Sequence, residues 1–288
     1  PRPKSSAASD VYKRQIIMLS ITFPAISPIL FEFGPISIRW YSLAYIFGFI
    51  FAWKYIQYLI KQKGFFLVNH NISPKDVDDL IFYGIIGLIF GARFGYILFY
   101  NFSYYISEPI RMFYVWEGGL SFHGGLLGIV LAIFLFTKSK KISFLTISDL
   151  ICASAPVGIF LGRISNFINA ELYGRPTDVF IGIIFPNTDG LHRHPSQIYE
   201  ALLEGLTIFI VLNIMIYSYK KLKQTGYISG MFLMLYSTFR FLIEFTREPD
   251  IQVGYIFNQL TMGMILSIPM FLFGIVLIYY SKKNDGRK

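Results

Sequence analysis

Residues 147–168 read ISDLICASAPVGIFLGRISNFI, and this stretch decides the fold class of the chain. Its only charged side chains are Asp149 and Arg163. A helix needs roughly 20 mostly apolar residues to cross a bilayer, so the stretch predicts a membrane-spanning helix. An ionised side chain inside the membrane costs roughly 2.5–3.5 kcal/mol. Arg163 is therefore the first candidate for a functional residue.

The composition of the whole chain agrees with a membrane protein. Of its 288 residues, 54% are hydrophobic and only 15% are charged, whereas soluble domains average about 25% charged residues. These values exclude a disordered chain and a coiled coil, and they argue against a soluble enzyme. The single cysteine excludes an internal disulfide and a cysteine-based zinc site.

Six further stretches are similarly long and apolar, so the sequence predicts an all-α, polytopic membrane protein with seven transmembrane helices. They are residues 39–60, 79–100, 119–136, 197–218, 227–246 and 257–280. Residues 1–17 begin without Met and have no signal-peptide pattern, and we interpret them as a non-native or disordered leader. Residues 18–288 contain no linker-like segment and are predicted to form a single domain.

Lysine and arginine are distributed unevenly over the segments that connect these spans. With the spans alternating in direction, one side carries thirteen of these residues and the other carries five. Because such an excess marks the cytoplasmic side, we predict an N-terminus outside and a C-terminus in the cytoplasm. Most of the net charge of +9 then comes from lysines and arginines on the cytoplasmic side, near anionic lipid headgroups, and does not indicate a nucleic-acid site. The thirteen are Lys61, Lys63, Lys75, Lys138, Lys140, Lys141, Lys220, Lys221, Lys223, Lys282, Lys283, Arg287 and Lys288, and the five are Arg39, Arg111, Arg175, Arg193 and Arg247.

Ionisable residues within the predicted spans gather toward the outer ends. Arg240, Glu244 and Arg247 are spaced i, i+4, i+7, which places them on one helix stripe. His123 and Arg163 lie in the outer halves of their own spans. Internal ion pairing or snorkelling to the interface would explain any single one of them. Together they indicate a pocket open to the outer leaflet, where arginines favour an anionic ligand such as a phospholipid headgroup. Further ionisable residues in the spans are Arg93, Glu200 and Glu204.

Glycines flank two of these residues. Gly118-Gly119 and Gly124-Gly125 lie on the two sides of His123, and Gly162 and Gly174 flank the block that contains Arg163. Small residues are common where membrane helices pack closely. The alternative is an irregular backbone beside a bound headgroup, which a membrane protein tolerates only where it lines a cavity.

Six blocks of the sequence resemble the bacterial prolipoprotein diacylglyceryl transferase family. The resemblance runs in order from about residue 24 to the C-terminus. Ser165 and Ala170 stand where that family usually or commonly has Gly. The blocks are residues 39–41 (RWY), 92–96 (ARFGY), 116–125 (WEGGLSFHGG), 162–175 (GRISNFINAELYGR), 194–200 (HPSQIYE) and 240–250 (RFLIEFTREPD).

This resemblance implies a reaction. The diacylglyceryl group of phosphatidylglycerol is transferred to the lipobox cysteine thiol of a prolipoprotein, which forms a thioether and releases glycerol phosphate. The partners are then phosphatidylglycerol, membrane lipids and the prolipoprotein signal peptide, with no nucleic acid, metal or organic cofactor. The resemblance also implies a multi-pass protein of the bacterial inner (cytoplasmic) membrane, with its active site toward the outer leaflet.

The chemistry of this reaction gives the candidate residues their expected roles. A thiol of pKa ~8.5 is mostly protonated at pH 7, so it needs a base. His123 is the first candidate, and Glu171 and Glu244 are alternatives. We expect Arg163 to bind the headgroup and Arg240 to stabilise the leaving phosphate. The resemblance further implies headgroup hydrogen bonds for Tyr41 and Asn166, arginine-orienting roles for Glu171 and Glu244, and importance for Gly174 and Arg247.

Two other functions remain open on the residues alone. Another phospholipid-headgroup transferase would use the same arginines. A membrane transporter would also place arginine and glutamate inside the bilayer. It would usually show inverted repeats or paired broken helices, and neither is visible in this sequence.

Overall fold

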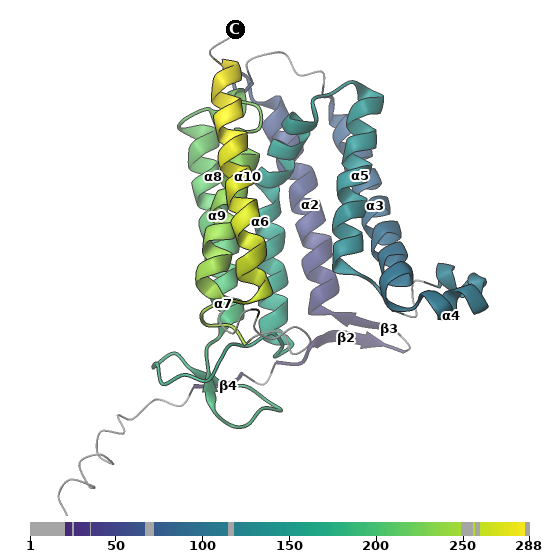
Figure 1. Ribbon diagram of the computed structural model, residues 1–288, viewed down its shortest axis with the longest axis vertical. Coiled ribbons are helices and arrows are strands. Elements are labelled where there is room, and N and C mark those ends of the chain that lie inside the picture. Colours follow the sequence, from purple (N-terminus) through teal and green to yellow (C-terminus); the bar gives the residue numbers. More distant parts are fainter. Residues whose placement is uncertain are drawn as a thin grey trace, which may run out of the picture.

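The computed structural model describes residues 21–24, 26–34, 36–66, 72–114, 118–248, 256 and 260–285. These residues form a bundle of long helices with small β elements at one end (Figure 1). The predicted leader, residues 1–17, lies outside the described residues.

Six helical segments are long and apolar enough to cross a membrane, which confirms a polytopic membrane protein. The seventh expected span forms α9 (Tyr227–Ile243), an apolar helix of 17 residues. It ends before residue 246 because residues 244–246 form a turn. The six are α2 (Trp40–Lys61), α3 (Pro74–Tyr100), α5 (Phe122–Lys140), α6 (Phe144–Ile168), the continuous segment of α7 (Ser196–Glu200), η3 (Ala201–Thr207) and α8 (Ile208–Tyr217), and α10 (Met262–Asp285).

The chain is mostly helical, as the all-α prediction requires, but two small sheets that this prediction did not include are also present. β1 (Ile21–Thr22) pairs in parallel with β4 (Ile183–Ile184), which pairs antiparallel with β5 (His192–Arg193). β2 (Ile29–Phe33) and β3 (Ile36–Arg39) form a separate hairpin. These strands lie in connecting segments, where backbone groups that no helix satisfies must find other partners. The remaining short helices are α4 (Phe102–Ser107), η1 (Pro109–Phe113) and η4 (Lys221–Lys223).

Specific caps begin two of the long helices. Ser73 and Asp76 form a reciprocal capping box at the start of α3, with Pro74 in the first turn. The start of α9 is capped from another helix, because buried Asp149 of α6 accepts hydrogen bonds from the backbone of Gly226 and Ser229 at 2.6 and 2.8 Å. Asp149 therefore has a structural role and fixes α9 against α6.

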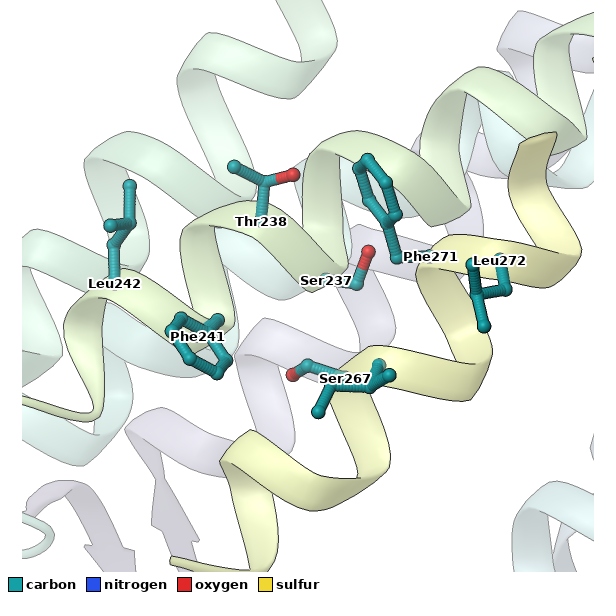
Figure 2. Close-up of a pocket in the computed structure, with 8 residues that line it drawn as sticks. Ser237, Thr238, Phe241, Leu242, Ser267, Phe271 and Leu272 are labelled. Atoms are coloured by element: carbon teal, nitrogen blue, oxygen red, sulfur yellow. The ribbon is translucent and has the colours of Figure 1, made fainter. Parts of the chain in front are cut away.

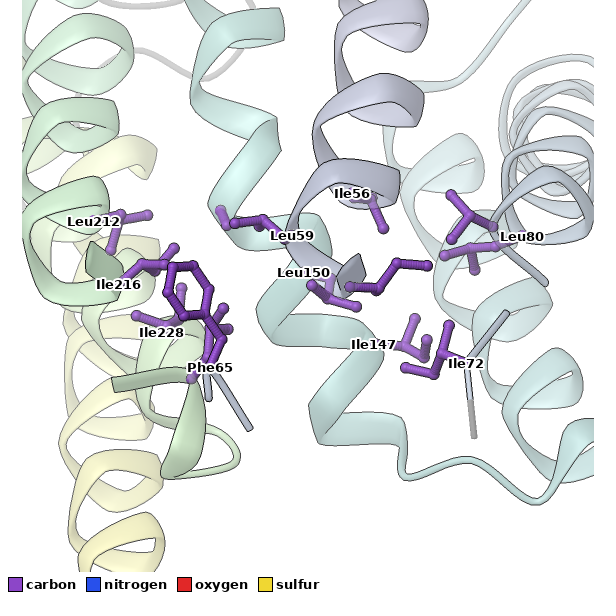
Figure 3. Packing of buried hydrophobic residues seen from close by; sticks show 14 of the residues in the cluster. Ile56, Leu59, Phe65, Ile72, Leu80, Ile147, Leu150, Leu212, Ile216 and Ile228 are labelled. Carbon is purple, nitrogen blue, oxygen red and sulfur yellow. The ribbon is translucent and has the colours of Figure 1, made fainter. Parts of the chain in front are cut away.

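The apolar core lies toward the end of the bundle where the C-terminus is found (Figures 1 and 3). Leu59 of α2, Leu150 of α6 and Leu212 of α8 are fully buried there and belong to one cluster, which Ile228 of α9 joins. α2, α5 and α10 all end at this end with lysines in their last turns. The ionisable residues of the candidate site lie at the opposite end of the bundle.

α3 and α5 pack through facing glycines. A Cβ atom on Gly91 would lie 2.7 Å from Cα of Gly128, and one on Gly95 would lie 2.7 Å from Cα of Gly124. Any side chain at these positions would separate the helices. Gly124 therefore serves helix packing within the regular α5, whereas Gly118 and Gly119, on the other side of His123, have positive φ values of 84° and 74° and form the expected irregular backbone.

Arg93 of α3 is buried inside the protein, and its contacts with backbone carbonyl groups give it a structural role. Its guanidinium donates hydrogen bonds to the carbonyl groups of Arg111, Met112 and Gly118 at 2.6, 3.0 and 2.5 Å. The Tyr105 ring lies 5.0 Å from the guanidinium carbon. Arg93 thus ties the connection between α3 and α5 to the bundle.

Candidate active site

A buried carboxylate joins three arginines at the strand-bearing end of the bundle. Glu200 of α7 is fully buried. Its Oε1 lies 2.8 Å from Nη1 of Arg240 and 2.5 Å from Nη1 of Arg247, while its Oε2 lies 3.2 Å from Nε of Arg163. Glu200 therefore connects α6 with α9 and with the segment that follows α9.

Two further glutamates complete what we call the ion network: Arg163, Glu200, Glu204, Arg240, Glu244 and Arg247. Glu204 Oε2 lies 3.2 Å from Nη2 of Arg163. Glu244 pairs with Arg240, and its Oε1 lies 3.6 Å from Nε of Arg247. The three positive and three negative charges balance, as buried charges require.

The arginines, rather than the glutamates, are the groups of this network that a ligand can reach. The side chains of Glu200 and Glu204 have no exposed surface, whereas Arg163 is 20% exposed and Arg240 is 17% exposed. The carboxylates hold the guanidinium groups from the buried side. An anion is the ligand that suits the exposed side.

The segment that supplies the two central glutamates is partly a π-helix. η3 (Ala201–Thr207) follows α7 directly and contains Glu204. Gly205 packs so closely on α6 that an added Cβ atom would lie 2.6 Å from Cβ of Phe160. π-Helical turns within α-helices are frequently found at functional sites. Here the turn brings Glu204 next to Arg163 while Gly205 allows the helices to meet.

A second polar group lies at the end of α6 and the start of α2. The Asn166 amide nitrogen donates to the Tyr41 hydroxyl and to Glu171 Oε1, the latter at 2.8 Å. The Gln197 side chain donates to the backbone carbonyl of Glu171 at 2.6 Å. Tyr41, Asn166 and Glu171 are thus brought together, as three of the predicted site residues.

Among the residues that the structure describes, no arginine pairs with Glu171, contrary to expectation. Its carboxylate accepts hydrogen bonds from Asn166 and, at 3.4 Å, from Asn169. The physical reason lies in the turn after α6, where Ala170 and Leu172 have positive φ values of 53° and 57°. This left-handed backbone returns the chain toward α6, so Glu171 meets the two asparagines. Ala170, which stands where the family commonly has Gly, occupies a conformation that glycine adopts more readily.

Gly174 connects the segment after α6 to the segment after α9. It forms a β-bridge with Arg247, and its N–H donates to the His194 carbonyl at 2.8 Å. An added Cβ atom would lie 2.7 Å from Cβ of His194. Arg175 continues the connection, since its Nε donates to the Arg247 carbonyl at 2.6 Å. Gly174 thereby fixes the backbone of Arg247 beside the ion network.

The connection between α6 and α7 has its own ion pairs. Arg193 contacts Asp189 and Glu248, each at 2.9 Å. The Arg193 hydrogen bond holds the pKa of Asp189 below its usual value. Partial burial lowers the pKa of His194 below its usual value, because desolvation disfavours the charged ring. Among the described residues, no group of three His, Cys, Asp or Glu side chains is arranged to hold a metal ion.

His123 lies apart from the ion network. It occupies the exposed first turn of α5, where its ring contacts Phe122 with centroids 5.7 Å apart. Within the described part of the chain it makes no hydrogen bond and no ion pair. α5 packs mainly on α3, whereas the ion network lies on α6, α7, η3, α9 and the residues that follow α9.

Glu200 and Glu204 are the principal residues that were not named as site residues from the sequence. Their signal was present, because two carboxylates spaced i, i+4 in an apolar span require partners. Of the residues expected to converge, Arg163, Arg240, Glu244 and Arg247 lie together, whereas His123 does not join them. What each of these residues does remains a prediction.

Known proteins resemble this chain over nearly its whole length. The family model described as prolipoprotein diacylglyceryl transferase matches residues 28–280. The phosphatidylglycerol–prolipoprotein diacylglyceryl transferase of Rickettsia felis is 49% identical over 261 residues, which cover 91% of this chain and 99% of that protein. The enzyme of the same name from Rickettsia bellii is 48% identical over 258 residues, covering 90% and 96%. That of Rickettsia akari is 48% identical over 261 residues, covering 91% and 99%.

Proposed function

Because the chain belongs to the prolipoprotein diacylglyceryl transferase family, we propose that it transfers the diacylglyceryl group of phosphatidylglycerol to the lipobox cysteine of prolipoproteins. The products are a thioether-linked lipid and glycerol phosphate. The main structural support is the ion network, which presents Arg163 and Arg240 to an anionic ligand over buried carboxylates.

The reaction requires one bond to form and one to break. The cysteine sulfur attacks the glyceryl carbon that bears the phosphoester oxygen, and the carbon–oxygen bond breaks with its electron pair going to the phosphate. The thiol proton passes to a base. Negative charge grows on the leaving phosphate, so fixed positive charge in a water-poor site lowers the barrier. Arg163 holds the headgroup phosphate in this proposal, and Arg240 stabilises the leaving group.

The remaining site residues act by positioning. Tyr41 and Asn166 hydrogen-bond the headgroup, and their mutual contact supports this pairing. Glu244 orients Arg240 and Arg247. Glu171 fixes Asn166, and Gly174 fixes the chain that carries Arg247.

We further propose the orientation of the protein in the bacterial inner membrane. α9 is the seventh span, since it packs against α6 and α10 within the bundle. The helix ends rich in lysine then face the cytoplasm, and the ion network faces the outer leaflet. This arrangement gives an outside N-terminus and a cytoplasmic C-terminus.

The proposed reaction is tested by transfer from radiolabelled phosphatidylglycerol to a lipobox peptide, using the purified full chain in lipid-supplemented detergent. We expect label on the cysteine peptide, no label on its Cys→Ser counterpart, and release of glycerol phosphate. Phosphatidylethanolamine serves as the control donor. Label that reaches the Ser peptide equally, or no label with a folded protein, would contradict the reaction. Solute flux into vesicles without diacylglyceryl transfer would instead support the alternative function of a membrane transporter.

His123 is the base of this proposal, with Glu171 and Glu244 as alternatives, and its exposed position leaves it accessible to a bound thiol. We expect His123→Ala to lower kcat/KM by about 10²–10⁴-fold near pH 7, the usual contribution of a general base. Because the thiolate fraction rises with pH, the loss should shrink toward pH 9. The measurement is the pH profile of kcat/KM, with His192→Ala as the matched control. If His123→Ala catalyses diacylglyceryl transfer at a near-normal rate at pH 7, His123 is not the base, and Glu171 or Glu244 would have this role.

A further inference from the structure

A groove lies between α9 and α10 (Figure 2), with a volume of about 240 Å³. The two helices approach closely at both ends of it. At one end a Cβ atom on Gly230 would lie 2.8 Å from the Gly274 carbonyl oxygen, and at the other a Cβ atom on Gly263 would lie 2.7 Å from Cδ of Glu244. The groove is therefore closed at both ends by helix contacts and open along its side.

The groove has an apolar surface even though hydroxyl groups lie in it. Ser237 donates its hydroxyl to the Leu233 carbonyl at 2.6 Å, Thr238 to that of Met234 at 2.7 Å, and Ser267 to that of Gly263 at 2.7 Å. Each hydroxyl is thus satisfied within its own helix. The rest of the lining is hydrocarbon or aromatic, so the surface suits a hydrocarbon ligand.

The shape of the groove follows from small residues below and large residues beside it. Ser237 and Ser267 are 1% and 3% exposed and form its floor. Phe241 and Phe271 line it as half-buried rings. Leu272 at its edge is 56% exposed, so the open side faces the lipid that would surround the bundle.

The groove borders the ion network at Glu244, whose contact with Gly263 closes this end of the groove. Ser237, Phe241 and Glu244 are spaced i, i+4, i+7 and share one stripe of α9, beside Arg240. On α10, Gly263 contacts Glu244 and lies one turn before Ser267. A lipid whose phosphate contacts Arg240 can therefore place its apolar part in the groove by passing this contact along the open side.

Building on the proposed function, we propose that this groove holds one acyl chain of the phosphatidylglycerol donor and sets the acyl-chain preference of the transfer. The lining residues 237–242 and 267–272 extend over roughly 8 Å of each helix axis, at about 1.5 Å per residue. A helix with its side chains is about 10–12 Å across and does not fit such a groove, which excludes the signal peptide as its occupant. The Gly230–Gly274 contact limits how much of a chain the groove can accept.

The test uses two variants that change the groove in opposite directions. Ser267→Leu fills its floor and Phe271→Ala widens it, whereas Ser267→Ala removes the same hydroxyl without filling and is the matched control. Each protein receives an equimolar mixture of dioctanoyl and dipalmitoyl phosphatidylglycerol with a lipobox peptide, and mass spectrometry gives the ratio of the two products. This ratio does not depend on how much of the protein is folded.

We expect Ser267→Leu to lower the ratio of long-chain to short-chain product about tenfold, the effect of a methylene in a hydrophobic pocket. Phe271→Ala should raise the ratio, and Ser267→Ala should leave it unchanged. Product formed at the wild-type ratio by Ser267→Leu would overturn the groove proposal. Absence of product from either donor with wild type would contradict the proposed function instead.

A photoreactive lipid locates the chain directly. Phosphatidylglycerol with a terminal diazirine on one chain should label peptides that contain residues 237–242 or 267–272. Excess unlabelled phosphatidylglycerol should compete, and Ser267→Leu should lose the label. Labelling that does not saturate and is unchanged in Ser267→Leu would show bulk lipid contact only and would overturn the proposal.

Discussion

Glu200→Gln is expected to lower the rate of diacylglyceryl transfer by about 10²-fold or more. Glu200 fixes the position of all three arginines, and a displacement of a catalytic group by about 1 Å can lower the rate by that factor. The fully buried carboxylate contacts Arg163, Arg240 and Arg247. Gln keeps the shape but removes the charge, so three guanidinium groups share two carboxylates. Removing one member of a buried ion pair typically costs about 3–5 kcal/mol.

The measurements are kcat/KM in the transfer assay and the midpoint of thermal unfolding in detergent. Asp189→Asn is the matched control, since it also changes a carboxylate to an amide beside an arginine. Asp189 is 43% exposed, so its loss should change stability by less than about 1 kcal/mol. A second variant that combines Glu200→Gln with Arg247→Gln restores the charge balance and should recover part of the lost stability. Wild-type transfer by Glu200→Gln would exclude Glu200 as an organising residue.

The membrane class and the grouping of the arginines were predictable because they depend on composition and spacing. Apolar length identifies a span without any knowledge of its neighbours. The stripe of Arg240, Glu244 and Arg247 follows from helix geometry alone, and its internal contacts are present in the structure. The position of Arg163 at the same end of the bundle as this stripe follows from the alternation of the spans.

The side-chain contacts between different helices were not predictable, because they depend on how each helix is rotated about its axis. Glu200 and Glu204 were visible as costly residues in a span, but their contacts with Arg163 arise from packing at Gly205 and from the π-helical turn. Glu171 meets Asn166 because two residues after α6 adopt a left-handed backbone, which spacing does not reveal. The glycines around His123 fitted both helix packing and an irregular backbone, and the structure has one on each side: Gly124 faces glycines of α3, whereas Gly118 and Gly119 have positive φ values.

Arg163→Lys tests whether the geometry of the guanidinium matters in addition to its charge. Arg163 uses Nε toward Glu200 and Nη2 toward Glu204, each at 3.2 Å, and a planar fork can serve both carboxylates while keeping another edge for a phosphate. Lysine has a single ammonium group and cannot hold this arrangement. We expect kcat/KM to fall about 10²–10³-fold, as when a positioned donor to a phosphate or a developing anion is removed.

The division of this loss between kcat and KM distinguishes two roles for Arg163. If Arg163 stabilises mainly the charge that develops on the leaving phosphate, kcat falls while KM for phosphatidylglycerol stays near its wild-type value. If it binds the ground-state headgroup equally well, KM rises instead. Arg193→Lys is the control, because Arg193 also contacts two carboxylates but outside the ion network. Full activity of Arg163→Lys would contradict a forked phosphate contact, and an equal loss in Arg193→Lys would indicate a general effect on the fold.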